Sequence, residues 1–291
     1  MTGIPFFKYH GLGNDFVLMN STDVPGGQKL NQLASQCCDR HRGIGADGLI
    51  LYHPSQNPQA RARMQIINAD GSEPEMCGNG LRTFAHYLHQ QHNFEERFLV
   101  ETAAGVLTCE LSDTTPQRTQ VRVDMGVPRL AQHDIPATGF SASPVINETL
   151  EVTESGDTRT FEVSLVSMGN PHCIVKVEQI PEDWHRWGKA LMVHPRFPKQ
   201  INVEFSVFHS PQEVEVKVWE RGVGPTEACG TGACAVAVAG QLMGLLEPTS
   251  QVHLPGGPLD IAWNGINQTV YMTGPSVAVY SGIYAIPQVK Q

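Results

Sequence analysis

The chain has 291 residues, of which 41% are hydrophobic and 17% are charged, so it is a globular chain long enough for two domains and not a disordered one. Its formal net charge of −9, without a basic stripe, argues against nucleic acid or an anionic membrane as a partner. No apolar run reaches the length of a membrane-spanning helix, and Met1–His10 lacks the layout of a signal peptide. We therefore expect a cytoplasmic protein.

Short strands and two helices are predicted along the chain. In chain order, the periodicity predicts a helix at Gly80–His89, strands at Val121–Met125, Phe161–Val166 and Val214–Val218, and a second helix at Gly232–Met243. The strands alternate apolar and polar residues, as half-buried strands do. The second helix consists of small and apolar residues almost throughout, so we expect it to be buried on all sides.

An internal repeat is the most informative feature. Glu75–Gly80 matches Glu227–Gly232 at an offset of 152 residues, and Gly13–Asn14 matches Gly169–Asn170 at an offset of 156. Two motif pairs in the same order at nearly the same offset indicate duplicated halves.

The repeat predicts two similar domains, each β-rich with one central helix. The first is expected at 1–127, completed by 277–291, and the second at 128–276. The loose composition of Pro128–Pro144 is typical of a boundary region.

Seven cysteines, an odd number, argue against a disulfide framework in a cytosolic chain. No C-x-x-C pair occurs, which disfavours a zinc ribbon or a thioredoxin motif. Cys77 and Cys229 differ from the others because each begins a Cys-Gly-x-Gly turn that leads into a predicted helix. The N-terminus of a helix binds carboxylates and lowers the pKa of an adjacent thiol.

Two such cysteines suit the inversion of a stereocentre. Inversion requires a base on one face of the carbon and an acid on the other, and a thiolate and a thiol can exchange these roles. Helix N-termini that bind the substrate carboxylate would stabilise the enediolate charge. Neither a metal nor a pyridoxal cofactor is then required.

Several motifs in the same order as in the family show that the chain resembles the diaminopimelate epimerases over nearly its whole length. The matching segments are Tyr9–Phe16, Arg42–Gly48, Asn68–Ser72, Met76–Gly80, Met168–His172, Asn202–Phe205, Trp219–Gly222 and Ala228–Gly232.

The resemblance implies an α+β fold of two pseudo-symmetric domains, each a sheet wrapped around a central helix, with the active site in the cleft between them. It implies that Cys77 and Cys229 are the acid/base pair and that His172 tunes one thiol. The residues implied to hold the substrate are Asn14, Asn68, Gly78, Asn79, Asn170, Asn202, Glu220, Arg221, Gly230 and Thr231.

By this resemblance the protein interconverts L,L- and meso-diaminopimelate, for lysine and peptidoglycan precursor biosynthesis, without a cofactor. Its expected partner is this small molecule, with no nucleic acid and no membrane, and a homodimer is left open. Two alternatives compete: a two-cysteine racemase of proline or hydroxyproline, and a non-catalytic amino-acid binding module. An isomerase that uses a carboxylic acid instead of thiols is a further alternative, which the two cysteines disfavour.

Overall fold

The structure, a computed structural model, describes residues 3–74 and 77–286. Glu75 and Met76 of the repeated motif, and the end of the predicted first domain at 287–291, lie outside the described residues. In the part of the chain that is described, no helix is both long and apolar enough to span a membrane.

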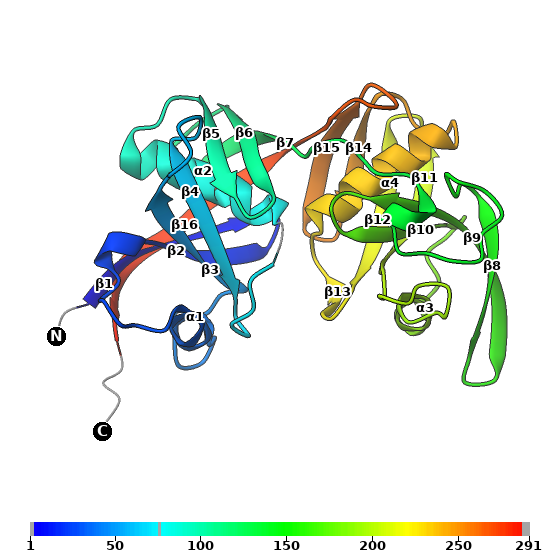
Figure 1. Ribbon diagram of the computed structural model, residues 1–291, viewed down its shortest axis with the longest axis horizontal. Coiled ribbons are helices and arrows are strands. Elements are labelled where there is room, and N and C mark those ends of the chain that lie inside the picture. Colours follow the sequence, from blue (N-terminus) through cyan, green and yellow to red (C-terminus); the bar gives the residue numbers. More distant parts are fainter. Residues whose placement is uncertain (1–2, 75–76, 287–291) are drawn as a thin grey trace. The chain divides into compact units, whose positions relative to one another are not determined.

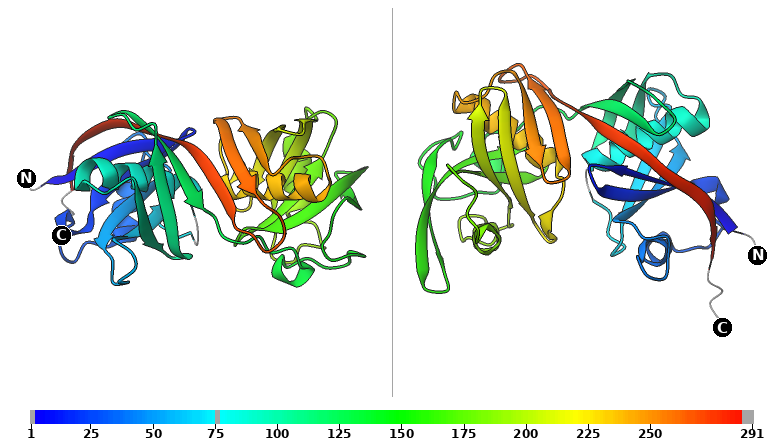
Figure 2. Two further views of the ribbon diagram at one scale, coloured as in Figure 1. Left: turned by 90° about the horizontal axis from the view of Figure 1, so that it is seen from above. Right: turned by 180° about the vertical axis from the view of Figure 1, so that it is seen from behind.

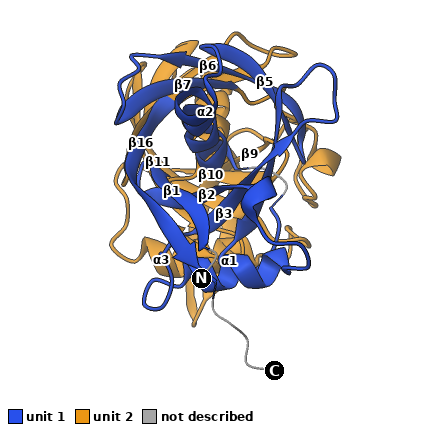
Figure 3. Cartoon of the chain, turned by 90° about the vertical axis from the view of Figure 1, so that its left-hand side faces the viewer, with its two compact units in different colours: residues 1–123, 274–291 blue, residues 124–273 orange. Residues whose placement is uncertain are grey.

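The chain forms two compact units (Figure 3). One comprises residues 1–123 together with 274–291, and the other comprises residues 124–273. The long strand β16 (Val270–Ala285) begins in the second unit and continues into the first, so the last part of the chain completes the N-terminal unit (Figure 1).

The first unit is a closed β-barrel with a helix inside it. Besides the C-terminal part of β16, its elements are β1 (Gly3–Gly11), β2 (Asn14–Asn20), η1 (Ser21–Asp23), α1 (Leu30–Cys38), β3 (Gly48–Pro54), β4 (Ala62–Asn68), α2 (Gly78–His92), β5 (Arg97–Thr102), β6 (Gly105–Ser112) and β7 (Arg118–Asp124). The strands follow one another in chain order from β1 to β7, and β16 pairs with both β7 and β1 to close the barrel. The pairs β2–β3 and β4–β5 are parallel.

The second unit repeats this strand order around its own central helix, but no pairing between β8 and β16 closes its sheet in the described part of the chain. Its elements are η2 (Gln132–Asp134), β8 (Glu148–Glu154), β9 (Asp157–Ser167), β10 (Pro171–Lys176), α3 (Trp184–Met192), β11 (Asn202–Ser210), β12 (Glu213–Glu220), β13 (Gly224–Thr226), α4 (Gly230–Leu242), β14 (Thr249–Leu254), β15 (Gly257–Trp263) and the first residues of β16. The strand order is β16-β15-β14-β12-β11-β10-β9-β8, with β10–β11 and β12–β14 parallel.

Each central helix is enclosed by its own sheet. α2 contacts β1, β2, β3, β4 and β6, and α4 contacts β9, β10, β11, β14 and β15. Figure 2 shows the strands of each unit around its central helix from two further sides. Every residue of Gly230–Gly240 is buried, which confirms the prediction of a helix buried on all sides. Every residue of Gly78–Leu88 is buried as well. The predicted fold class, α+β with two similar units built around central helices, is confirmed.

The two outer helices, α1 and α3, cover apolar clusters on the outside of the sheets. α1 contributes Leu33, Ala34 and two buried cysteines to a cluster with residues of β1 to β4. α3 contributes Trp184, Trp187 and Leu191 to a second cluster with residues of β8 to β11.

Candidate active site

Cys77 and Cys229 occupy the same position in the two units, the N-cap of the central helix. Both have extended backbone angles, φ −144° and ψ 97° for Cys77 and φ −119° and ψ 106° for Cys229. The Cys77 sulfur accepts a hydrogen bond from the Gly80 N–H at 3.2 Å, and the Cys229 sulfur accepts one from the Gly232 N–H at 3.4 Å. Each sulfur therefore satisfies one of the helix N–H groups that have no partner within the helix.

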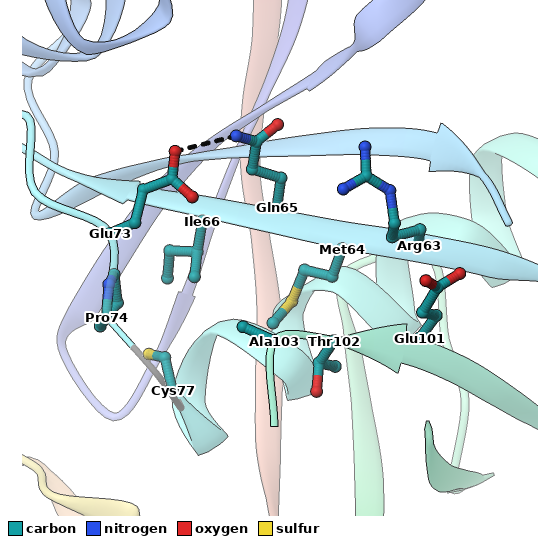
Figure 4. A pocket seen from close by; sticks show the side chains of 10 residues that line it. All are labelled: Arg63, Met64, Gln65, Ile66, Glu73, Pro74, Cys77, Glu101, Thr102 and Ala103. Carbon is teal, nitrogen blue, oxygen red and sulfur yellow. Dashed lines mark hydrogen bonds between the residues drawn. The ribbon is translucent and has the colours of Figure 1, made fainter. Parts of the chain in front are cut away.

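The thiol of Cys77 is half-buried and lies at the wall of a pocket of about 250 Å³ within the first unit. Figure 4 shows this thiol near Pro74, with side chains of β4 and of the end of β5 lining the same pocket. Gln65 donates to Glu73 across the pocket at 3.0 Å. The sulfur is therefore accessible from one side while the helix N-terminus holds it from the other.

Three of the predicted substrate contacts of the first unit are held by polar interactions. Asn79 donates to the side-chain oxygen of Asn14 at 3.1 Å, and Asn14 donates to the Asp47 carboxylate at 2.7 Å. The third, Asn68, donates to the Ser72 hydroxyl at 3.0 Å. Asn14 and Asn79 are thus brought together beside the first turn of α2, whereas Asn68 lies at the end of β4 and is bonded within its own turn.

A charged network lies behind Asn14. The Lys8 ammonium, which is buried, lies 2.5 Å from the Asp15 carboxylate and also donates to the Gly45 carbonyl. Arg40 donates to Asp15 through two nitrogens, at 2.8 and 3.1 Å, and to Asp47 at 2.7 Å. Burial alone would raise the pKa of Asp15, but the hydrogen bonds and charges of Arg40 and Lys8 lower this pKa to about 2.

Asp15 is therefore expected to make the stability of the protein depend on pH in acid. The pKa of Asp15 in the folded protein, about 2, lies below the ordinary value of 3.8. The ionised carboxylate therefore adds about 2 kcal/mol to the free energy of unfolding above about pH 4, and this contribution is lost as the pH falls towards 2. Asp15→Asn should therefore destabilise the fold at neutral pH, and the difference from wild type should shrink on acidification. Denaturant unfolding at several pH values measures this, and a difference that does not change with pH would contradict it.

In the second unit, a chain of polar side chains leads away from Cys229. The sulfur lies 3.5 Å from the Thr231 hydroxyl, which accepts a hydrogen bond from Asn170 at 3.2 Å. The Asn170 oxygen lies 3.0 Å from Nε2 of His172, whose Nδ1 lies 2.7 Å from the Glu204 carboxylate. The structure thus brings together four site residues predicted from the sequence, together with Glu204, which was not predicted.

The pKa of Cys229 differs from the sequence expectation. A helix N-terminus was expected to lower it, but burial, together with the charges of Glu220 and Glu204, raises the pKa of Cys229 well above its ordinary value. Hydrogen bonds from Thr231 and Gly232 act in the opposite direction and are weaker. The thiolate loses more by leaving water than it gains from the helix, so Cys229 rests as a thiol.

Glu220, Asn202 and Arg221 lie at the ends of β11 and β12. Burial raises the pKa of Glu220, while hydrogen bonds with Thr226, at 2.6 Å, and with the Cys229 thiol oppose this rise. Asn202 accepts from the backbone N–H of Arg221 at 2.8 Å and so fixes that turn. The guanidinium of Arg221 is exposed and donates to the Lys199 carbonyl at 3.2 Å. Glu220 therefore faces the thiol, and Arg221 points outward from the same turn.

Gly232→Ala is expected to disturb this half-site although alanine is the better helix former. An added Cβ at Gly232 would lie 2.8 Å from Glu204 Oε1 and 3.3 Å from the Cys229 sulfur. Displacing a buried carboxylate is costly, so we expect a destabilisation of about 1–3 kcal/mol and loss of Cys229 reactivity.

The equivalent change Gly80→Ala is the matched control. Its added Cβ would meet the Cys77 sulfur at 3.2 Å and the ends of two isoleucine side chains at 3.1 and 3.3 Å, groups that can move a little. Gly80→Ala should therefore be milder in thermal unfolding and in thiol alkylation. Equal effects of the two substitutions would argue against a special constraint at Gly232.

Two polar residues in these half-sites were not predicted from the sequence. Glu204 is the only charged residue in the buried run Ile201–Phe205, and a carboxylate between the apolar residues Val203 and Phe205 is the signal that could have revealed it. Asp47, which holds Asn14, lies in the Arg42–Gly48 motif without a distinguishing local pattern.

Two β-rich units, each with a cysteine capping its buried central helix, define a fold class that solved structures share. One of them is a hydroxyproline epimerase from Agrobacterium vitis with bound trans-4-hydroxy-L-proline; it is 17% identical, with a TM-score of 0.69 over 97% of this chain and 92% of that chain. At this identity the likeness shows the fold alone.

Sequence comparison then assigns the family. The family model for diaminopimelate epimerase matches residues 6–131 and 164–279. A diaminopimelate epimerase of Desulfitobacterium hafniense is 49% identical over 280 residues, covering 95% of this chain and 96% of the relative. One of Heliobacterium modesticaldum is 47% identical over 282 residues, covering 95% and 98%. The chain belongs to the diaminopimelate epimerase family, and it is an isomerase.

Proposed function

We propose that the protein interconverts L,L- and meso-diaminopimelate, with Cys77 and Cys229 as the two groups that exchange a proton with the α-carbon. The observation that carries this proposal is the matching place of the two sulfurs, each at the N-cap of a central helix in one of two repeated units. Inversion requires two proton carriers on opposite faces of one carbon, and a duplicated half-site supplies two of the same kind.

The reacting carboxylate is proposed to bind at the two helix N-termini. Backbone N–H groups of Gly78, Asn79, Gly230 and Thr231 belong to the first turns of α2 and α4. Such groups attract an anion and stabilise the negative charge that develops when the α-proton leaves. Burial raises the pKa of Cys229 and favours its thiol, the form that donates a proton, and the two cysteines are proposed to exchange the acid and base roles between the two directions of the reaction.

The distal amino-acid head is proposed to bind to the polar residues at the rims of the half-sites. The exposed guanidinium of Arg221 can form a two-bond fork with a carboxylate. The amide oxygens of Asn14, Asn68, Asn170 and Asn202 and the carboxylate of Glu220 are proposed to accept from the substrate ammonium groups. His172 is proposed to influence the thiol chemistry through Asn170.

The reaction is proposed to proceed without a cofactor and in the cytoplasm. Diaminopimelate is the proposed partner, with neither nucleic acid nor membrane involved, and a homodimer is the assembly that the family resemblance leaves open. The proposed product serves lysine and peptidoglycan precursor biosynthesis.

Incubation with L,L-diaminopimelate in heavy water tests the function. Deuterium should appear at the α-carbon as the meso isomer forms, because the proton returned to the inverted carbon comes from a thiol that exchanges with solvent. Formation of the meso isomer without α-deuterium, or no turnover at all, would contradict the proposal.

The same assay with L-proline and trans-4-hydroxy-L-proline tests the racemase alternative. These substrates have no distal charged head for Arg221 to bind, so we expect no turnover of either. A non-catalytic binding module would bind diaminopimelate without any exchange of its α-proton, and the assay in heavy water separates that case as well.

A further inference from the structure

Glu204 is a buried carboxylate behind Cys229 that the proposed reaction does not use. It lies on β11, and its side chain and that of His172 are both 0% exposed. One oxygen, Oε1, lies 2.7 Å from Nδ1 of His172, and the other is buried and accepts no hydrogen bond from any residue in the described ranges. Burying a carboxylate is costly unless a partner offsets the lost hydration, and His172 is the partner that the structure places against Glu204.

The hydrogen bonds from Glu204 run without interruption to the catalytic sulfur. They pass from Glu204 to His172 at 2.7 Å, to Asn170 at 3.0 Å, to the Thr231 hydroxyl at 3.2 Å and to the Cys229 sulfur at 3.5 Å. All five residues belong to the second unit.

The two acceptors on either side of His172, the Glu204 carboxylate and the Asn170 side-chain oxygen, set the direction of every bond in this chain. An ionised carboxylate can only accept, so Nδ1 of His172 donates to Glu204. Nε2 faces the side-chain oxygen of Asn170, which also only accepts, so Nε2 donates too. The Asn170 nitrogen then donates to the Thr231 oxygen, and the only hydrogen of that hydroxyl is left to point at the sulfur of Cys229.

We propose that Glu204 is a positioning residue that fixes the direction of these hydrogen bonds, so that Thr231 presents a donor to the sulfur of Cys229. The inference rests on the proposed role of Cys229 as an acid/base group. Glu204 itself moves no proton. Without its charge, a neutral His172 can accept at one nitrogen, Asn170 can turn round, and the Thr231 hydrogen can point at Asn170 instead of at the sulfur.

The effect of hydrogen-bond direction on Cys229 can be measured separately from the effect of net charge. The charged groups that act on the sulfur are Glu220 from β12 and Glu204 from β11, His172 from β10 acts on Glu220, and α4 contributes no charged residue. With both ring nitrogens donating, His172 is positively charged and balances Glu204. Glu204→Gln with a neutral His172 keeps the same net charge, so a change at Cys229 would report the direction of the hydrogen bonds.

Alkylation by iodoacetamide, followed by peptide mass spectrometry across a range of pH, measures thiolate formation at each cysteine without any substrate. Glu204→Gln and Thr231→Val should each slow the alkylation of Cys229 at neutral pH on the order of tenfold, because a thiolate loses a hydrogen bond from a neutral donor. The double variant should be no slower than either single variant. If the wild-type protein did not turn over diaminopimelate, the proposed function would be overturned, but the alkylation rates would still test the role of Glu204.

Three controls are built into the chain. Glu215→Gln removes the carboxylate of another His–Glu pair of this unit, 3.4 Å from exposed His209, and should change nothing. Cys77, in the first unit, should be alkylated at the wild-type rate. Cys173, which is buried in β10, reports unfolding if it becomes reactive.

The outcomes decide the proposal. An unchanged profile of Cys229 in either single variant, or effects that multiply in the double variant, would overturn it. Should Glu204→Gln not fold, Thr231→Val and Thr231→Ser leave the carboxylate in place and carry the test. Valine removes the donor and must slow the alkylation of Cys229, whereas serine keeps the hydroxyl and must retain a rate near wild type; any other result would also overturn the proposal.

Discussion

Replacing either Cys77 or Cys229 with alanine is expected to lower the rate of epimerisation by about 10⁴-fold, the upper range for loss of one acid/base group. Each substitution leaves one face of the α-carbon without a proton carrier, so inversion fails even when the substrate still binds. The fold should survive, because each alanine removes only the sulfur that caps one helix N–H, worth about 1 kcal/mol.

Initial rates with L,L-diaminopimelate, together with thermal unfolding of each variant, measure both expectations. Cys109→Ala is the matched control, since Cys109 is a buried thiol of β6 outside the proposed site and its loss should leave the rate unchanged. A Cys77→Ala or Cys229→Ala variant that folds and epimerises at a rate near wild type would show that inversion does not use two thiols.

The central helices could be predicted because their signals are local. The Cys-Gly-x-Gly turns gave the helix N-termini to within two residues, and the observed helices begin at Gly78 and Gly230. The strands at 121–125, 161–166 and 214–218 lie within or overlap β7, β9 and β12, since a half-buried strand has a period of two.

The outer helices could not be predicted in the same way. Neither α1 nor α3 has a side-chain cap at its N-terminus, and each has only nine residues. α3 also contains Gly188, whose added Cβ would lie 3.0 Å from Trp219, so a tertiary contact and not helix propensity selects this glycine.

Burial of polar residues was the other feature that sequence patterns missed. In α2, Arg82, Thr83 and His86 are fully buried, because a helix inside a closed barrel has no face open to solvent. Arg82 reaches the Pro275 carbonyl, and His86 contacts Ser276, both on a strand nearly 200 residues further along the chain. Only the long-range pairing of β16 supplies these partners.

The candidate site likewise combines features with a local sequence signal and features that depend on long-range contacts. The cysteines and their helix turns are marked by the repeat, whereas the partners of Asn14 and His172 come from other strands and turns. The raised pKa of Cys229 likewise depends on burial inside the folded unit and on the carboxylates of Glu220 and Glu204, which come from two neighbouring strands. A local argument from the helix N-terminus therefore gave the wrong direction for this thiol.

Arg221→Lys should lower kcat/KM for diaminopimelate by about 10²-fold, as expected when a buried or bound carboxylate loses a paired charge contact. Lysine keeps the positive charge but presents one point of contact instead of the planar fork that matches a carboxylate. The backbone of Arg221 is held by Asn202 at 2.8 Å, and its guanidinium is already oriented by the Lys199 carbonyl at 3.2 Å. A lysine at this position loses that orientation as well.

The loss should be specific to the distal head of the substrate. Steady-state kinetics are measured with diaminopimelate and with an amino acid that lacks the distal carboxylate. The ratio of the two kcat/KM values should be smaller in Arg221→Lys than in the wild type. Arg118→Lys, an exposed arginine at the start of β7, is the matched control and should leave both rates unchanged. Unaltered kinetics of Arg221→Lys with diaminopimelate would remove Arg221 from the binding site and leave the distal carboxylate to be held by another group.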